Sequence, residues 1–122
     1  MDKKELSSLL GRAQGYVNLI DLGSVYGVAV LVKGNHCYDY QVQRNQTRLK
    51  KRHIDEFAKD FAIACVEECE DEFYHEVKNA YRTLKEDEAI ALIYGSPCGD
   101  FDHYHKGNFK ELTERISEDL GR

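Results

Sequence analysis

Residues 47–85 read TRLKKRHIDEFAKDFAIACVEECEDEFYHEVKNAYRTLK and contain neither glycine nor proline. Apolar residues recur along this stretch at steps of three and four, the spacing that places side chains on one stripe of an α-helix. We therefore predict one long helix here, with a stripe made of Ile54, Ala58, Phe61, Cys65, Cys69, Phe73, Val77, Ala80 and Leu84.

A straight helix of this length does not fit inside one small domain. It would be roughly 55 Å long at 1.5 Å per residue, whereas a compact chain of 122 residues has a radius of gyration of about 14 Å. The stripe also drifts around the helix axis by roughly 100°, so one half can cover a sheet while the other half faces elsewhere. A second subunit is the simplest cover for that half. We expect a homodimer through this helix, with a break near residues 70–72 as the alternative.

The residues before residue 47 predict a helix followed by three strands. Residues 3–14 have a helical apolar stripe that Gly15 ends, and residues 16–22 and 36–43 alternate as strands do. Residues 25–33 are apolar on both sides, which is typical of a central strand. Gly34-Asn35 suits a two-residue hairpin turn, so these three strands are expected to form an antiparallel meander.

The residues after the long helix predict two strands and a final helix. Residues 89–94 form a short apolar run typical of a buried strand, and residues 100–105 alternate as a fifth strand would. Asn108 suits the N-cap position, with Glu111 three residues later, of a helix lined by Phe109, Leu112, Ile116 and Leu120. The order α-β-β-β-α-β-β-α predicts one α+β domain over residues 1–122, with an antiparallel sheet of about five strands.

Composition indicates an ordinary soluble protein in a reducing compartment. The longest wholly apolar run, residues 28–32, is too short to cross a bilayer, and the first residues lack the apolar core of a secretory signal. The cysteines are not spaced like a secreted disulfide framework. We expect a cytoplasmic protein with reduced thiols at Cys37, Cys65, Cys69 and Cys98.

Charge is distributed unevenly around the formal net value of −5. Residues 53–76 hold one lysine against nine acids, which serve either solubility or the docking of a basic partner. The docking hypothesis uses the acids of the second half of the predicted helix: Glu67, Glu68, Glu70, Asp71, Glu72 and Glu76.

A basic block precedes these acids and consists of Arg44, Arg48, Lys50, Lys51 and Arg52. The predicted order of elements over residues 6–64 resembles the double-stranded-RNA-binding domain, in which a lysine pair at the start of the last helix grips phosphates. Lys50 and Lys51 match that pair, and the resemblance implies RNA or anion binding through Arg48, Lys50, Lys51 and Arg52. Two RNA-contacting loops of that family have no counterpart here, and the acidic helix repels phosphate. We therefore favour a protein partner over nucleic acid.

Two groups of residues could bind a metal. Cys65 and Cys69 lie one helical turn apart and could supply two zinc ligands, although they equally continue the apolar stripe as small core residues. Residues 98–105 are the second group. His103 and His105 would project to one face of a strand at a spacing that suits a metal, and Asp100 could bind a hard cation. Cys98 could be a further metal ligand or a nucleophile paired with either histidine. A polar hairpin at the sheet edge is the plainer interpretation.

We predict a non-enzymatic cytoplasmic protein, bacterial or phage in origin, that needs no cofactor. It would act by protein–protein interaction as an inhibitor, immunity protein or chaperone-like protein, with Glu67, Glu68, Asp71, Glu72 and Glu76 at the interface. The predicted order of elements is also similar to that of class I type III secretion chaperones, which are acidic homodimers. The alternatives are a metal-binding protein or hydrolase that uses zinc or another divalent metal at residues 98–105, and an RNA-binding module.

Overall fold

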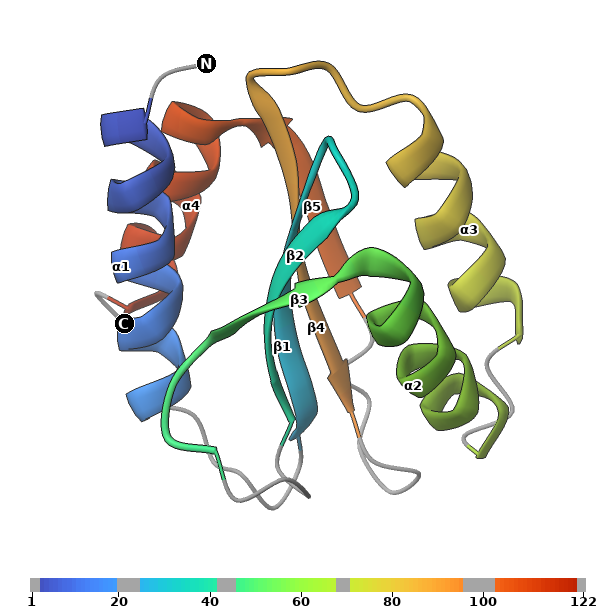
Figure 1. The fold of residues 1–122 in the computed structure, drawn as a ribbon. Helices are drawn as coiled ribbons and strands as arrows, with labels where there is room; N and C mark the ends of the chain where they lie inside the picture. The colour runs from blue at the N-terminus through green and yellow to red at the C-terminus, as the bar shows by residue number, and fades with distance from the viewer. Residues whose placement is uncertain (1–2, 20–24, 42–45, 68–70, 96–102, 121–122) are drawn as a thin grey trace.

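The computed structural model describes residues 3–19, 25–41, 46–67, 71–95 and 103–120. Five antiparallel strands form one sheet in the order β3-β2-β1-β4-β5. Figure 1 shows this sheet between two pairs of helices, with α1 and α4 on one face and α2 and α3 on the other. The elements are α1 (Lys3–Leu19), β1 (Val25–Val32), β2 (His36–Gln41), β3 (Lys50–His53), α2 (Ile54–Glu67), α3 (Asp71–Arg82), β4 (Glu88–Gly95), β5 (His103–Asn108) and α4 (Phe109–Leu120). The predicted α+β class and antiparallel sheet are confirmed.

The alternation of side chains along β1 supplies both faces of the core. Val30 and Val32 point to the α1–α4 side, where they join Leu9, Phe109 and Leu112. Ala29 and Leu31 point to the opposite side, where they pack beneath residues of α2 and α3. Because both faces are covered, the central position predicted for residues 25–33 is confirmed.

The first helix is longer than predicted, and the strand predicted at residues 16–22 is wrong for residues 16–19. Residues 20–22 lie outside the described residues. Helix α1 continues through Gly15 to Leu19, because Val17 extends the stripe of Leu9 and Ala13 and is only 5% exposed. Burying that turn outweighs a cost of about 1 kcal/mol for a glycine inside a helix.

The third strand comes from the beginning of the stretch predicted as a long helix. Residues Lys50–His53 pair antiparallel with β2, with Cys37 opposite Arg52 and His36 opposite His53. The meander therefore exists, but its strands are β1, β2 and β3. Its first turn is at the predicted place, where Gly34 and Asn35 both have positive φ, 103° and 65°.

The long helix is two helices, so the prediction of one continuous helix is wrong. The rings of Phe61 on α2 and Phe73 on α3 lie 6.1 Å apart, whereas twelve residues of continuous helix would separate them by about 18 Å. The break near residues 70–72, considered as the alternative, agrees with α2 ending at Glu67 and α3 beginning at Asp71. Both halves of the stripe now cover the same face of the sheet. The physical reason for expecting a second subunit on this helix is thereby removed.

The last part of the chain follows the prediction closely. Strand β4 contains the predicted residues 89–94, and β5 contains residues 103–105 of the predicted fifth strand, while residues 100–102 lie outside the described residues. Asn108 is the N-cap of α4, because its Oδ1 accepts the Glu111 N–H at 2.8 Å. Its Nδ2 also donates to Glu111 Oε1 at 3.0 Å.

Candidate functional site

A groove of about 300 Å³ lies between α2 and α3 above the sheet. Its floor consists of Leu31 from β1, Phe57 and Phe61 from α2, and Val77 from α3. On the other face, the cavity between the sheet and the α1–α4 layer measures only about 20 Å³. A separate depression of about 370 Å³ between α1 and α4 is lined by charged and hydroxyl-bearing side chains, namely Lys4, Glu5, Ser8, Lys110, Thr113 and Glu114. The groove is an apolar depression in a surface that is otherwise highly charged, and such depressions are typical of binding sites.

The walls of the groove come from one flank of each helix. The wall on α2 consists of Ile54, Asp55 and Ala58. The wall on α3 consists of residues from successive helical turns: Tyr74, Lys78, Tyr81 and Arg82. Asn35 in the β1–β2 turn completes the lining. Four of the lining side chains are aromatic, and aromatic rings bury large areas with little loss of conformational entropy.

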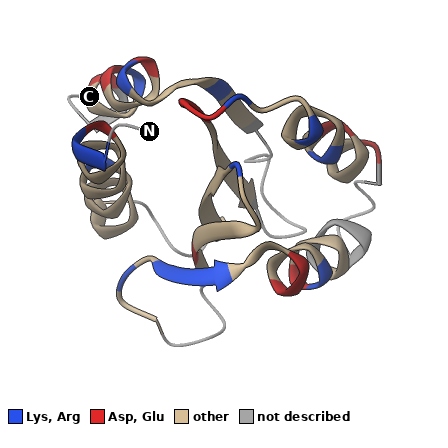
Figure 2. Ribbon diagram, turned by 45° about the horizontal axis from the view of Figure 1, so that its top comes forward, with Lys and Arg blue, Asp and Glu red and all other residues tan. Residues whose placement is uncertain are grey.

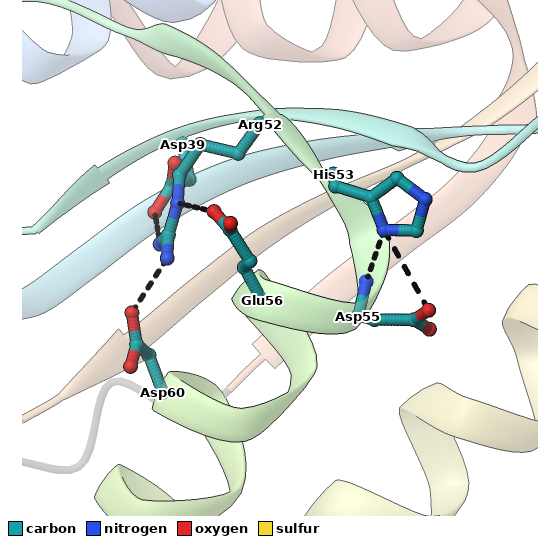
Figure 3. A network of polar contacts seen from close by, with 6 residues as sticks. All are labelled: Asp39, Arg52, His53, Asp55, Glu56 and Asp60. Carbon is teal, nitrogen blue, oxygen red and sulfur yellow. Dashed lines mark hydrogen bonds and ion pairs between the residues drawn. The ribbon is translucent and has the colours of Figure 1, made fainter.

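Helix α2 is fixed to the sheet by the ion-pair network of Arg52 (Figure 3). Asp39 on β2 is fully buried, and its Oδ2 accepts a hydrogen bond from Arg52 Nη1 at 2.9 Å. Arg52 Nη2 donates to Asp60 Oδ2 on α2 at 2.7 Å, and Glu56 lies 3.9 Å from Arg52 Nε. Burial alone would lower the pKa of Arg52, but the hydrogen bonds to Asp60 and Asp39 outweigh burial and raise it.

The N-terminus of α2 is tied to its own strand and to the β1–β2 turn. The Ile54 N–H donates to the Asn35 carbonyl oxygen at 2.8 Å. The Asp55 N–H donates to His53 Nδ1 at 3.2 Å (Figure 3), so the imidazole satisfies one of the free N–H groups of the first turn. These contacts fix the α2 wall at the end of the groove that Asn35 and Asp55 line.

Helix α3 is anchored separately, to β1 and to β5. The Tyr81 hydroxyl donates to the Val32 carbonyl oxygen at 3.2 Å, and the Tyr104 hydroxyl on β5 donates to Glu76 Oε1 at 3.1 Å. The rings of Phe61, Phe73 and Tyr74 bring the two helices into contact nearer the break between them. The groove thus lies between two helices that are held to the sheet by different strands.

The groove carries charge of both signs on opposite walls. Asp55 lies on α2, whereas Lys78 and Arg82 lie one turn apart on α3. The Lys78 ammonium is 5.8 Å from the centre of the Tyr74 ring, a distance that permits a cation–π contact. Lysines and arginines of α3 are shown in blue in Figure 2.

The acids predicted to bind a partner lie apart from the groove where they are described. Glu72 and Glu76 are exposed on α3. The hydrogen bond between Glu76 and Tyr104 places this flank of α3 toward β5, and Glu72 lies one turn before Glu76. Glu67 lies in α2 and Asp71 in α3, but the structure does not describe their side chains. Glu68 lies outside the described residues.

The basic residues lie on a strand rather than at the start of a helix. Lys50 and Lys51 are exposed on β3, which Figure 2 shows as a blue edge strand, and Arg48 is exposed just before it. Arg52 belongs to the buried network. The match of Lys50 and Lys51 to the lysine pair of the double-stranded-RNA-binding domain is therefore wrong in its structural position. Lysines on an edge strand discourage pairing with another sheet.

The predicted metal ligands fall largely outside the described residues. This holds for Cys69, Cys98 and Asp100, and for the side chains of Cys65 and His103. His105 is partly exposed on β5, and its Nδ1 lies 3.0 Å from Arg115 Nη1. Within the described part of the chain, no three His, Cys, Asp or Glu side chains are grouped so that they could hold a metal ion.

The sequence patterns above do not predict the groove, although the sequence contains a signal for it. Tyr74, Lys78 and Tyr81 form a second stripe on α3, beside the core stripe of Phe73 and Val77. An aromatic stripe next to a buried one indicates a helix flank that is only half covered. This flank becomes a groove wall only because α2 and α3 lie side by side.

No protein-family model, curated protein or solved structure matches this chain. Across the described helices, none combines the length and the apolar character needed to span a membrane. The groove between α2 and α3 and the charges around it are therefore the basis for any functional conclusion.

Proposed function

We propose that this protein acts by protein–protein interaction, without catalysis, and that it receives apolar side chains of a partner protein in the α2–α3 groove. The observation that carries this proposal is the open groove of about 300 Å³ over Leu31, Phe57, Phe61 and Val77. Covering apolar surface contributes about 25 cal/mol per Å². A partner that inserts one or two large side chains would gain most of its affinity there, as interface hot spots do.

Blocking the groove tests this proposal. Peptides displayed on phage are selected on the immobilised protein, and their affinity is then measured for the variant Ala58→Trp, whose indole would fill the groove from α2. We expect peptides with aromatic or large aliphatic anchors, and a loss of about tenfold or more on Ala58→Trp, which corresponds to roughly 1.4 kcal/mol.

Ile63→Trp is the matched control. Ile63 lies on the same helix, is 56% exposed and does not line the groove, so its replacement should leave peptide affinity unchanged. Circular dichroism checks that both variants fold. Peptides that bind both variants equally well would show that the groove is not the binding site. If light scattering instead shows a dimer that Ala58→Trp dissociates, the occupant is a second copy of this chain.

A second candidate is the docking of a basic partner on the acidic flank of α3. It is supported by the exposure of Glu72 and Glu76 along one side of that helix, and by the negative charge of the whole chain, which would speed association with a basic protein. The variant Glu72→Lys/Glu76→Lys should reduce binding of basic peptides, whereas Glu114→Lys/Glu118→Lys on α4 makes the same change of charge elsewhere. Equal effects of the two variants would exclude a specific acidic site.

A further inference from the structure

The walls of the α2–α3 groove carry more positive than negative charge, although the chain as a whole is acidic. Among the described residues that line the groove, Lys78 and Arg82 give two positive charges and Asp55 gives the one negative charge. In the described part of the chain, neither Lys78 nor Arg82 forms an ion pair. The formal net charge of the whole chain is −5. The groove wall on α3 is thus a local exception to that charge.

The acids near the groove whose side chains the structure describes are mostly directed elsewhere. Glu76 on α3 accepts the Tyr104 hydroxyl on the flank toward β5. Asp60 and Glu56 on α2 lie beside Arg52, on the flank toward β3. Asp55 remains at the groove, but its carboxylate lies 3.6 Å from His53 Nδ1 and is 83% exposed. It also lies in the first turn of α2, where the helix dipole stabilises negative charge. The two cations of α3 are therefore the charges most available to a ligand.

We infer that the partner segment held in the groove is amphipathic and acidic, with Asp or Glu directly beside its apolar anchors. The apolar side chains would rest on Phe57, Phe61 and Val77, and the carboxylates would pair with Lys78 and Arg82 on the α3 wall. The guanidinium of Arg82 can bind a carboxylate through two parallel hydrogen bonds. This inference rests on the proposed function, because it names the chemistry of the segment that the groove receives.

Three labelled synthetic peptides test the inference. They share the same Leu and Phe anchors at helical spacing and differ only in the flanking residues, which are Glu, Gln or Lys. Fluorescence anisotropy gives their affinities for the wild-type protein and for Lys78→Glu/Arg82→Glu. Exposed ion pairs each contribute only weakly, so we expect the Glu peptide to bind about threefold to tenfold more tightly than the Gln peptide, and the Lys peptide to bind most weakly. Added salt should reduce these differences.

The charge-reversed variant should invert this order, with the Lys peptide binding most tightly. Lys59→Glu/Lys110→Glu, at two exposed lysines outside the groove, changes the net charge equally and should keep the wild-type order. An order that Lys78→Glu/Arg82→Glu leaves unchanged overturns the inference, as does tightest binding of the Lys peptide to the wild-type protein.

The inference and the proposed function fail in different ways. If Ala58→Trp weakens all three peptides while the order is insensitive to Lys78 and Arg82, the groove binds partners but does not select acidic ones. If the peptides bind and Ala58→Trp has no effect on any of them, the groove is not the site and both are wrong. If none of the three binds the wild-type protein, the groove does not take a segment of this chemistry, and the inference is overturned.

Discussion

The side chain of Tyr94 on β4 occupies the space directly above Gly27 on β1, where any other residue would carry its Cβ. The two residues are register partners across the sheet, and Gly27 also faces Gln41 on β2. Tyr94 is almost fully buried, with its ring against Phe57 and Phe61. A glycine at residue 27 therefore makes room for the aromatic core beneath α2.

Replacing Gly27 by alanine should destabilise the protein by about 1–3 kcal/mol. The new methyl group would meet the Tyr94 ring and the Tyr40 carbonyl group, and overpacking of a filled core typically costs that much. Urea denaturation followed by circular dichroism measures the change. Gly11→Ala is the control, because no atom lies within 4 Å of a Cβ at that exposed helical position. It should stabilise α1 by about 0.5–1 kcal/mol. Equal effects of the two variants would contradict the packing argument.

Replacing Arg52 by methionine should lower the free energy of unfolding by about 3 kcal/mol. The variant leaves the fully buried Asp39 carboxylate without the guanidinium that lies 2.9 Å from it, and removing one partner of a buried pair is strongly destabilising. Lys51→Met, at an exposed neighbouring residue, should change stability by less than about 0.5 kcal/mol. Arg52→Met/Asp39→Leu should recover most of the loss, since it removes both buried charges. If the double variant is as unstable as Arg52→Met, the loss of stability comes from altered packing and not from the unpaired Asp39 charge.

Stability should fall as the pH rises above about 9. Burial, aided by the Asp39 carboxylate, raises the pKa of the Cys37 thiol from an ordinary value of 9.0 to about 12. Between these two values the unfolded chain loses the thiol proton while the folded chain keeps it. The folded state then binds more protons, so its stability decreases by up to about 1.4 kcal/mol per pH unit. Burial also raises the pKa of Tyr94, which extends the loss above pH 10.

Urea denaturation of the wild-type protein and of Cys37→Ala over this pH range isolates the thiol. The variant should have a constant difference in stability from the wild type below about pH 8 and a flatter decline between about pH 9 and 10. Parallel curves for the two proteins would show that Cys37 does not carry the dependence.

Replacing Asn108 by alanine should cost about 1 kcal/mol. The substitution removes the acceptor of the Glu111 N–H bond at the start of α4, and loss of an N-cap typically has that effect. Thermal or urea denaturation gives the value. Asn79→Ala provides the comparison, because Asn79 is exposed in the middle of α3 and alanine has the higher helix propensity there. A loss of stability in Asn79→Ala as large as in Asn108→Ala would rule out a specific capping effect.

Local patterns predicted correctly those elements whose defining contacts lie close together in the chain. The run of apolar residues in β1 predicted a central strand. The Asn108 and Glu111 spacing predicted the start of α4, since both ends of that interaction lie within one turn. Residues 16–19 satisfied helical and strand patterns alike, and burial of Val17 against the sheet selected the helix. The sequence shows the acids of α3, but it does not show that they lie apart from the groove. That separation depends on which flank of the helix meets β5.

Short-range spacing and composition are sufficient to predict the α+β class, the central strand, the last helix and the uneven charge. Where residues 47–85 change from strand to helix, and where the chain reverses, depends on contacts between residues far apart in the chain. The pairing of Arg52 with Asp39 draws residues 50–53 into the sheet. Contact of Phe61 with Phe73 brings the two halves of one apolar stripe onto the same face. The groove arises from that reversal, since its walls are far apart along the chain and meet only when α2 and α3 cover the sheet together.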